Sequence, residues 1–302
     1  MSRSPSATAT RSRPDLQQKA DHLMLRIAVP NKGSLSETAS EMLKEAGYAG
    51  RRDPKALHLL DERNGVEFFF LRPRDIATYV GSGALDVGIT GRDLLLDSGS
   101  AAHEVDALGF ADSTFRFAGT PGRFTDLQDL DGVRVATSYP GLVGEFLARH
   151  GVTSTLVKLD GAVESAVRLG VADAVADVVS TGSTLRAAGL EIFGPVILES
   201  TALLISTDER IPGIDVLRRR LQGVLVARGY VMLDYDIPTD LLEQATAVAS
   251  GIESPTVSSL HDRDWSAVRV MIPREDANLI MDALYDLGAR AILVSPIHAA
   301  RL

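Results

Sequence analysis

From residue 25 onward, short apolar runs typical of buried strands alternate with segments in which apolar residues recur at helical spacing. A short apolar strand, LRIAVP, precedes a loop and a helix in which apolar residues recur at helical spacing between positions 35 and 46. Two further apolar runs, VEFFFLRP and ALDVGIT, enclose a helix, RDIATYVGSG, and a turn, GRD, follows the second run. Strands that alternate with helices and read as nearly continuous apolar runs indicate a parallel sheet covered on both faces.

The same pattern recurs further along the chain. VRVATSYPGLVGEFLARHGV repeats the first strand, loop, helix and glycine, and GAVESAVRLGVADAVADVV repeats the helix and strand unit around Asp86. We therefore expect two similar α/β lobes, over residues 24–112 and 113–195, with the crossing between them inside 110–131. The run PVILESTALLIST should be one strand that returns to the first lobe at about 196–212. Two lobes joined by crossing strands form a cleft lined by loops at the carboxyl ends of strands.

The order of elements changes after about residue 211. A helix, IDVLRRRLQGVLVARG, is followed by the order β-α-β-β-α-β, which is that of a ferredoxin-like sandwich. Residues 213–302 are therefore expected to form a separate α+β domain. Small sandwiches of this kind more often bind or sense ligands than catalyse reactions, an argument by analogy of fold.

Residues 1–23 have a different composition. They are rich in Ser, Thr, Ala and Arg and contain no apolar core, so they do not read as a secretory signal. They superficially resemble an organellar transit peptide, but their composition favours a disordered tail. A second methionine, Met24, stands directly before the first strand, which leaves an internal start as an alternative.

Composition narrows the class of protein. A chain of 302 residues fits two or three compact units. The absence of cysteine excludes disulfides, thiolate zinc sites and cysteine nucleophiles, and it suits a reducing compartment such as the cytoplasm. A net charge of −9 argues against a dedicated nucleic-acid binder. No run approaches the roughly 18–20 apolar residues needed to span a membrane.

The stretch ADAVADVVSTGSTL places five small or hydroxylated residues, Ser180, Thr181, Gly182, Ser183 and Thr184, between a buried strand and a helix. Such a loop can aim backbone amides and hydroxyls at an anion, and the helix start adds positive partial charge. Helix capping is the alternative, but a cap accounts for one hydroxyl rather than four. The pattern favours a phosphate site.

Carboxylates flank this loop. Asp173 and Asp177 are four residues apart in the apolar strand, which puts them on one face, and LDGAVES adds Asp160 and Glu164. A carboxylate repels a neighbouring phosphate unless it holds ribose hydroxyls or Mg²⁺. Each one alone could cap a helix or face solvent. Together they predict a ribose-phosphate site.

Cationic residues cluster at the ends of three strands of the first lobe. They are Lys32, Arg72, Arg74 and Arg92. The Gly-Lys-Ser letters of PNKGSLSE are in the wrong order for a P-loop, so that nucleotide motif is rejected. Four cations at one edge nevertheless predict a polyanionic ligand.

These residues lie in motifs that resemble the ATP phosphoribosyltransferase family, the first enzyme of histidine biosynthesis, in its long, self-contained form. The motifs are AVPNKGSLSE, LRPRDI, DVGITGRDLL, RVATSYP, LDGAVE, ADAVADVVSTGSTL and ESPT, in family order from about residue 24 to the C-terminus. The resemblance implies an α/β fold. It consists of a two-lobed core like the type II periplasmic binding proteins and a C-terminal ferredoxin-like (ACT-like) regulatory domain.

The resemblance also implies a reaction. N1 of ATP attacks C1 of phosphoribosyl pyrophosphate, and pyrophosphate leaves with Mg²⁺ as cofactor. Ser180, Thr181, Gly182, Ser183 and Thr184 would hold the 5′-phosphate, with Glu164 and Asp177 beside the ribose as catalytic groups. Lys32, Arg72, Asp93 and Tyr139 would contact ATP or pyrophosphate. Which carboxylate touches Mg²⁺ stays open.

Regulation is implied for the last domain. In such enzymes it resembles an amino-acid sensor that binds L-histidine and inhibits catalysis from about 30 Å away or more, through rearrangement of domains or subunits. The matching positions are Asp236, Ile252, Ser254, Thr256 and Ala291. Alternatively, Asp236 simply begins the turn before Pro238. The family implies a homohexamer built from dimers.

Three other classes share parts of this pattern. A solute-binding protein has the same two lobes, but it usually carries a secretory signal and does not need the STGST loop with acidic neighbours. The porphobilinogen deaminase type attaches its cofactor through a cysteine, which this chain lacks. A form that needs a separate regulatory subunit is disfavoured because the chain carries its own C-terminal domain.

Overall fold

The computed structural model describes residues 24–51, 53, 55–262 and 264–301. The segment 1–23, predicted to be a disordered tail, lies outside the described residues. The chain divides into two compact units, which are described separately below. The larger extends to Glu41 and resumes over Ala49–Asp215, and the smaller combines Met42–Tyr48 with Val216–Leu302. Within the described residues, no helix is both long and apolar enough to cross a membrane.

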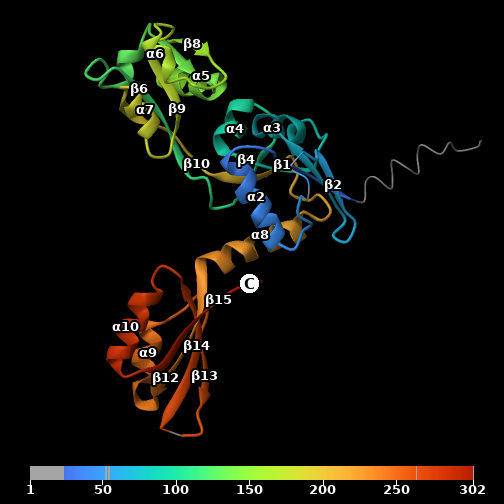
Figure 1. Cartoon of the computed structure of the whole chain (residues 1–302), viewed down its shortest axis with the longest axis vertical. Coiled ribbons are helices and arrows are strands. Elements are labelled where there is room, and N and C mark those ends of the chain that lie inside the picture. Colours follow the sequence, from blue (N-terminus) through green and yellow to red (C-terminus); the bar gives the residue numbers. More distant parts are fainter. Residues whose placement is uncertain (1–23, 52, 54, 263, 302) are drawn as a thin grey trace, which may run out of the picture. The chain divides into compact units, whose positions relative to one another are not determined.

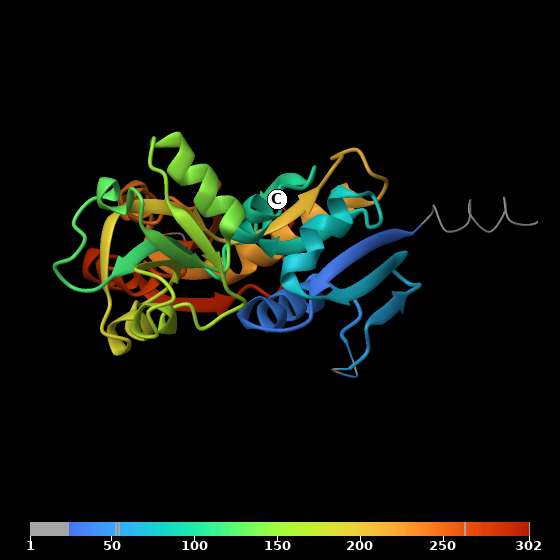
Figure 2. The same cartoon turned by 90° about the horizontal axis from the view of Figure 1, so that it is seen from above.

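The larger unit contains two sheets, which define two lobes. Lobe I is built on a six-stranded sheet of order β2-β3-β1-β4-β11-β5, in which β1 runs parallel to β3 and β4 (Figures 1 and 2). Its apolar core lies between this sheet and α3. The strands are β1 (Leu25–Pro30), β2 (His58–Asp61), β3 (Val66–Leu71), β4 (Val87–Gly91), β5 (His103–Ala107) and β11 (Ala202–Ser206), and the helices are α2 (Ser34–Glu45), α3 (Pro73–Gly81) and α4 (Arg92–Ser98).

Lobe II is built on a five-stranded sheet of order β10-β6-β9-β7-β8. Both faces are covered: Phe115 and Phe117 pack with α5 on one side, and Val175 and Leu185 belong to a second cluster on the other. Its strands are β6 (Ser113–Gly119), β7 (Arg134–Thr137), β8 (Thr155–Lys158), β9 (Ala174–Val179) and β10 (Glu191–Ser200), and its helices are η1 (Leu127–Leu130), α5 (Pro140–Arg149), α6 (Ser165–Arg168) and α7 (Ser183–Ala187).

Two local predictions are wrong. The run 195–207, expected as one strand returning to lobe I, is divided at Thr201, so that β10 pairs with β6 in lobe II and β11 pairs with β4 and β5 in lobe I. An unbroken apolar run does not reveal a change of sheet, because both strands are buried. The segment GRD, expected as a turn, instead opens α4, with Gly91 as its N-cap.

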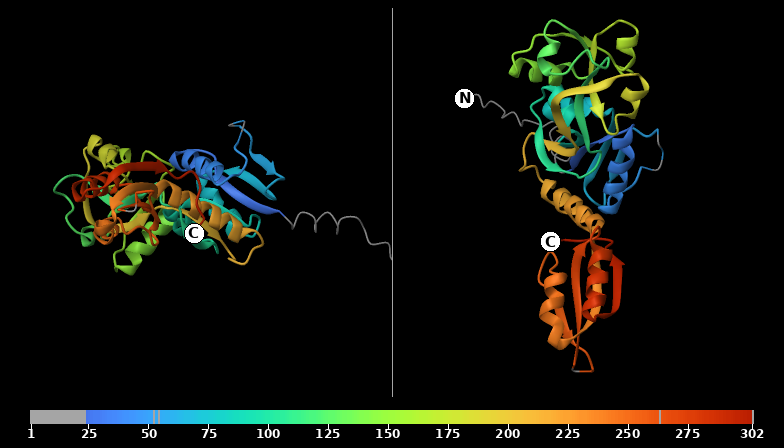
Figure 3. Two further views of the ribbon diagram at one scale, coloured as in Figure 1. Left: turned by 90° about the horizontal axis from the view of Figure 1, so that it is seen from below. Right: turned by 90° about the vertical axis from the view of Figure 1, so that its left-hand side faces the viewer.

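The smaller unit contains the ferredoxin-like sandwich that the order of elements predicted. Its antiparallel sheet has the order β13-β14-β12-β15, and α9 and α10 cover one face (Figure 3). Val231, Leu233, Tyr235 and Ile237 alternate along β12 into this core. The elements are α8 (Ile214–Gly229), β12 (Tyr230–Pro238), η2 (Thr239–Leu241), α9 (Leu242–Val248), β13 (Thr256–Ser259), β14 (Trp265–Pro273), α10 (Ala277–Leu287) and β15 (Arg290–Pro296).

Candidate active site

Three parallel strands of lobe I end at the same edge of the sheet. β1 leads to Lys32, β3 to Arg72 and β4 to Asp93, and the pairing of Pro30 with Leu71 aligns the first two ends. Lys32 and Arg72 are exposed, whereas Asp93 is buried. The structure therefore brings these predicted residues to one edge, where two exposed cations and a buried carboxylate follow neighbouring strands.

Asp93 is fixed by a residue from the crossing between the lobes. Its backbone N–H donates to Ser200 Oγ at 3.1 Å, and Ser200 Oγ donates back to Asp93 Oδ1 at 2.8 Å. A Cβ atom on Gly91 would collide with Asp93 Oδ1, so the glycine is needed for this close approach. Sequence reasoning missed Ser200, because a serine at the end of an apolar strand carries no motif.

Tyr139 of lobe II lies near this carboxylate. Its ring packs edge-to-face against Phe115, with 5.0 Å between the ring centres, and its hydroxyl is close enough to Asp93 for the carboxylate to affect the pKa of the phenol. Burial, followed by the nearby Asp93 charge, raises the pKa of the phenol far above its usual value. Tyr139 therefore stays protonated at neutral pH.

The two remaining cations of the predicted group have different surroundings. The Arg74 guanidinium lies 4.3 Å from the centre of the Tyr139 ring and pairs with Asp97 at 3.3 Å. Arg92 pairs with Glu104 at 2.7 Å and donates to the backbone oxygen of Glu199. Arg74 therefore belongs to the site edge, whereas the donors of Arg92 hold the crossing segments together.

Asp177 lies on β9 of lobe II. Burial is the main cause that raises its pKa above the ordinary value, and the Glu164 and Asp93 charges add to this effect. The Val178 backbone N–H and the Arg74 charge act in the opposite direction. Because these groups come from both lobes, Asp177 faces the place where the two lobes meet.

Asp173 is separated from this group, contrary to the sequence interpretation. It precedes β9 and forms ion pairs with Arg134 at 3.0 Å and Arg123 at 3.1 Å. The hydrogen bond from Arg134 is the largest cause that lowers the pKa of its carboxyl to about 2. Asp173 therefore stabilises lobe II locally. Asp160, the other predicted carboxylate, is exposed in the loop before α6.

The hydroxyl-rich loop connects β9 to α7. Gly182 is the N-cap of α7 and has a φ of +67°, a left-handed conformation that favours glycine. Ser180, Thr181, Ser183 and Thr184 are exposed, and the Thr181 and Ser183 hydroxyls lie 3.0 Å apart. Because a glycine occupies the N-cap position, neither Ser183 nor Thr184 caps this helix, and both hydroxyls remain exposed. Ser180 also lines a hollow of about 660 Å³ between the crossing segments, together with Thr114 and Ser200.

Carboxylates are present at this edge, but they do not form a metal centre alone. Among the described residues, no group of three or more His, Asp or Glu side chains has the arrangement of a metal site. Mg²⁺ is usually held by one or two carboxylates together with substrate phosphates. Asp177 and Glu164 beside a phosphate loop fit that donor set.

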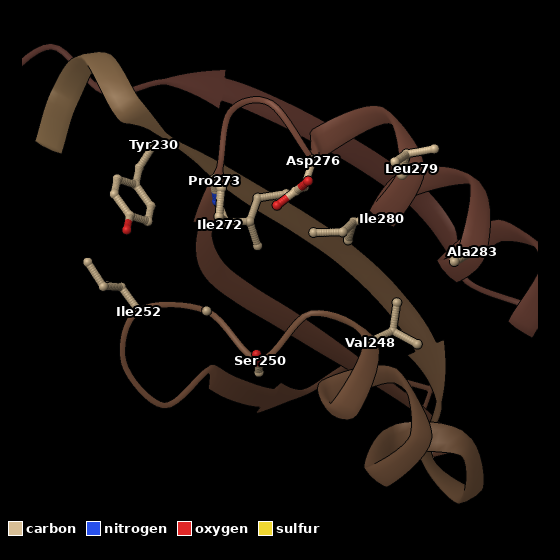
Figure 4. A pocket seen from close by; sticks show the side chains of 11 residues that line it. Tyr230, Val248, Ser250, Ile252, Ile272, Pro273, Asp276, Leu279, Ile280 and Ala283 are labelled. Atoms are coloured by element: carbon tan, nitrogen blue, oxygen red, sulfur yellow. The ribbon is translucent and has the colours of Figure 1, made fainter. Parts of the chain in front are cut away.

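The expected regulatory residues fall in different places in the smaller unit. Asp236, Thr256 and Ala291 line one hollow of about 400 Å³ on the sheet. Ala291 has a φ of +50°, at the irregularity where β15 pairs with β12 beside Asp236. Ile252 instead lines a second hollow, of about 580 Å³, near Tyr230 and Asp276 (Figure 4). Ser254 is exposed in the loop before β13.

Comparisons with known proteins agree with the sequence resemblance. Residues 72–223 match the family model described as ATP phosphoribosyltransferase, and residues 227–299 match its C-terminal domain. ATP phosphoribosyltransferases of Pseudarthrobacter chlorophenolicus and an Arthrobacter species are each 63% identical, over 92% of this chain and all of theirs. A chain of the ATP phosphoribosyl transferase (HisG:HisZ) complex from Thermotoga maritima is 27% identical, with a TM-score of 0.59, over 67% of this chain and 98% of that one.

Proposed function

Because this chain belongs to the ATP phosphoribosyltransferase family, whose members catalyse the first step of histidine biosynthesis, we propose that the edge shared by Asp93, Tyr139, Asp177 and the STGST loop is its active site. The observation that carries this proposal is the setting of Asp177. This carboxylate has a raised pKa, precedes the loop by three residues at its nearest end, and is acted on by charged side chains of both lobes. A two-lobed solute-binding protein is not favoured, because the relatives over the full matched length are transferases.

The reaction is a pentosyl transfer in which N1 of the adenine ring attacks C1 of the ribose and the C1–oxygen bond to pyrophosphate breaks. The ribose gains positive charge as that bond lengthens, and a carboxylate stabilises it. Asp177 and Glu164 are the carboxylates in position for this role. The exposed hydroxyls and the turn amides of 180–184 hold the 5′-phosphate, so the sugar is oriented before ATP attacks.

The other lobe binds the triphosphate and the leaving group. Lys32 and Arg72 supply exposed positive charge at the ends of β1 and β3. Asp93 of lobe I and Tyr139 of lobe II lie near each other and present a carboxylate and an aromatic ring to the adenosine end of ATP. We therefore assign ATP mainly to lobe I and phosphoribosyl pyrophosphate mainly to lobe II, and the phosphoribosyl group is transferred where the two lobes meet.

The site suits a Mg²⁺ ion that binds together with the pyrophosphate group. We assign most of its ligands to substrate oxygens and the rest to Asp177 or Glu164. When bound, it neutralises charge on the departing pyrophosphate.

Feedback inhibition by L-histidine is assigned to the hollow that contains Asp236, Thr256 and Ala291. The carboxylate suits the cationic amine of an amino acid, and the threonine hydroxyl suits its carboxylate. Ile252 and Ser254 lie outside this hollow, so we assign them to the same ligand only in an oligomer, where another copy can supply them. The proposal includes a cytoplasmic homohexamer.

The proposed phosphate-binding role of residues 180–184 is tested by removing a hydroxyl group from this loop. Thr184→Val, alone and with Gly182→Val, is assayed with ATP, phosphoribosyl pyrophosphate and Mg²⁺ by the ultraviolet absorbance of N1-substituted adenine. We expect the KM for phosphoribosyl pyrophosphate to rise about tenfold or more for Thr184→Val, because a hydrogen bond to a charged group contributes roughly 1.5–3 kcal/mol. Thr38→Val, on α2 and outside the loop, is the control. An unchanged KM in both loop variants contradicts the proposal.

A further inference from the structure

α4 of lobe I and α5 of lobe II meet at one carboxylate. Asp97 lies near the end of α4, and its side chain is only 12% exposed. Its Oδ1 accepts hydrogen bonds from the backbone N–H groups of Gly141 at 2.9 Å and of Leu142 at 3.2 Å. Both amides belong to the first turn of α5, where N–H groups have no acceptor inside the helix. A negative charge is also favourable there because of the helix dipole.

Asp97 takes the place of a cap that α5 does not supply itself. The N-cap residue of α5 is Tyr139, whose side chain makes no capping hydrogen bond, and the next residue is Pro140, which has no N–H. In most helices a side chain at the N-cap position accepts from the first turn. Here the acceptor comes from the other lobe, so capping this helix and holding the lobes together are the same interaction.

The contact is close and includes Arg74. A Cβ atom on Gly141 would lie 2.7 Å from the Asp97 backbone oxygen, so a glycine is needed where α5 meets α4. The second carboxylate oxygen of Asp97 accepts from Arg74 Nη1 at 3.3 Å, and the same guanidinium stacks on the Tyr139 ring. Asp97 therefore restrains both the Arg74 guanidinium and the start of α5, which carries Tyr139.

We propose that Asp97 is an interlobe latch, a positioning residue that holds the start of α5 in lobe II against α4 in lobe I and keeps Arg74 stacked on the Tyr139 ring. The kinetic consequence rests on the active site proposed above. Opening the lobes breaks the two hydrogen bonds from the backbone N–H groups of Gly141 and Leu142 to Asp97, and closing the lobes restores them. Without the latch a smaller fraction of molecules is closed, which weakens the apparent affinity for both substrates by the same factor.

The latch is tested on the full chain by amide hydrogen exchange and by kinetics. In Asp97→Ala, a peptide covering the first turn of α5 should exchange about tenfold faster or more, while a peptide from β9 exchanges as in the parent. The KM values for ATP and phosphoribosyl pyrophosphate should rise together, by about fivefold or more, with kcat changed less than about twofold. Asp97→Asn keeps an oxygen acceptor for the two amides and should restore most of the protection. Glu145→Ala, an exposed carboxylate on the same helix, is the matched control.

Two results overturn the latch: unchanged exchange at the start of α5 in Asp97→Ala, or faster exchange there with both KM values unchanged. Equally faster exchange in β9 shows general loss of lobe II stability and also overturns it. If Asp97→Ala behaves as expected while Thr184→Val leaves the KM for phosphoribosyl pyrophosphate unchanged, the latch holds and the proposed phosphate site fails. The two proposals are therefore separable.

Discussion

At the scale of single residues, Asp177 illustrates how function and stability oppose one another. Its pKa is raised mainly by burial, so the folded chain binds a proton more tightly there than the unfolded chain does. Between the unfolded and folded pKa values the folded state carries more protons, and stability therefore falls as the pH rises through that interval. The cost of burying the charge is fully present only above the folded pKa.

Asp177→Asn removes this charge without changing the size of the side chain. We expect the variant to melt at a higher temperature than the parent at pH 7, and the difference to disappear below the ordinary pKa of an aspartate, where both side chains are neutral. At the same time kcat should fall about 100-fold or more, because a charge acting on the transition state is lost. Thermal melts between pH 7 and pH 4, together with the transfer assay, check both parts. A lower melting temperature at pH 7 contradicts the assignment.

Asp173 and Asp177 also show what sequence could predict of the site. Their spacing predicted two carboxylates on one face of an apolar strand, but only Asp177 lies on β9, whereas Asp173 precedes it and meets Arg123 and Arg134. Those arginines are 50 and 39 residues away along the chain, so the ion pairs depend on tertiary packing. The same reason explains why Ser200 and Asp97 were missed, since their partners belong to distant segments.

At the scale of elements, the alternation of apolar strands and amphipathic helices was sufficient to predict β1, β3, β4, β7, β9 and β11 and the β-α-β-β-α-β order of the sandwich, but not β2, β5, β6 or β8. Short elements were predicted less well. α4 has seven residues, too few to show a helical period, and it ends at Gly99 in a left-handed conformation. The change of sheet at Thr201 lies inside a continuous buried run, where both strands require the same apolar residues.

Packing of α3 on β4 provides a test at this scale. A Cβ atom on Gly88 would lie 2.5 Å from Ile76 Cγ2 and 3.0 Å from Val80 Cγ2, both on α3. Gly88→Ala should therefore lower the free energy of unfolding by about 1–3 kcal/mol through overpacking. Gly144→Ala, inside α5, is the matched control. A Cβ atom there would lie 3.4 Å from Leu156, which is an ordinary contact distance. Alanine is also favoured over glycine inside a helix by up to about 1 kcal/mol. Denaturant unfolding of both variants checks the opposite signs. An unchanged Gly88→Ala midpoint contradicts the packing.

At the scale of the whole molecule, the chain combines a unit that contains both lobes with a unit that contains the sandwich. The residues proposed for catalysis lie in the first unit, and the hollow with Asp236, Thr256 and Ala291 lies in the second. If histidine binds in that hollow, inhibition is a coupling between two distinct sites, and changes in the hollow should alter inhibition separately from catalysis.

Asp236→Asn tests that separation. The variant keeps the size of the side chain and removes the charge that would pair with the cationic amine of histidine, so the concentration of L-histidine for half-inhibition should rise about tenfold or more. The kcat and both KM values without histidine should match the parent, because Asp236 belongs to the other unit. Asp240→Asn, an exposed carboxylate just after the same strand, is the control and should be inhibited normally. Titration calorimetry with L-histidine distinguishes lost binding from lost coupling: weakened binding supports the hollow as the histidine site, whereas unchanged binding and inhibition in Asp236→Asn would assign Asp236 to the turn before Pro238.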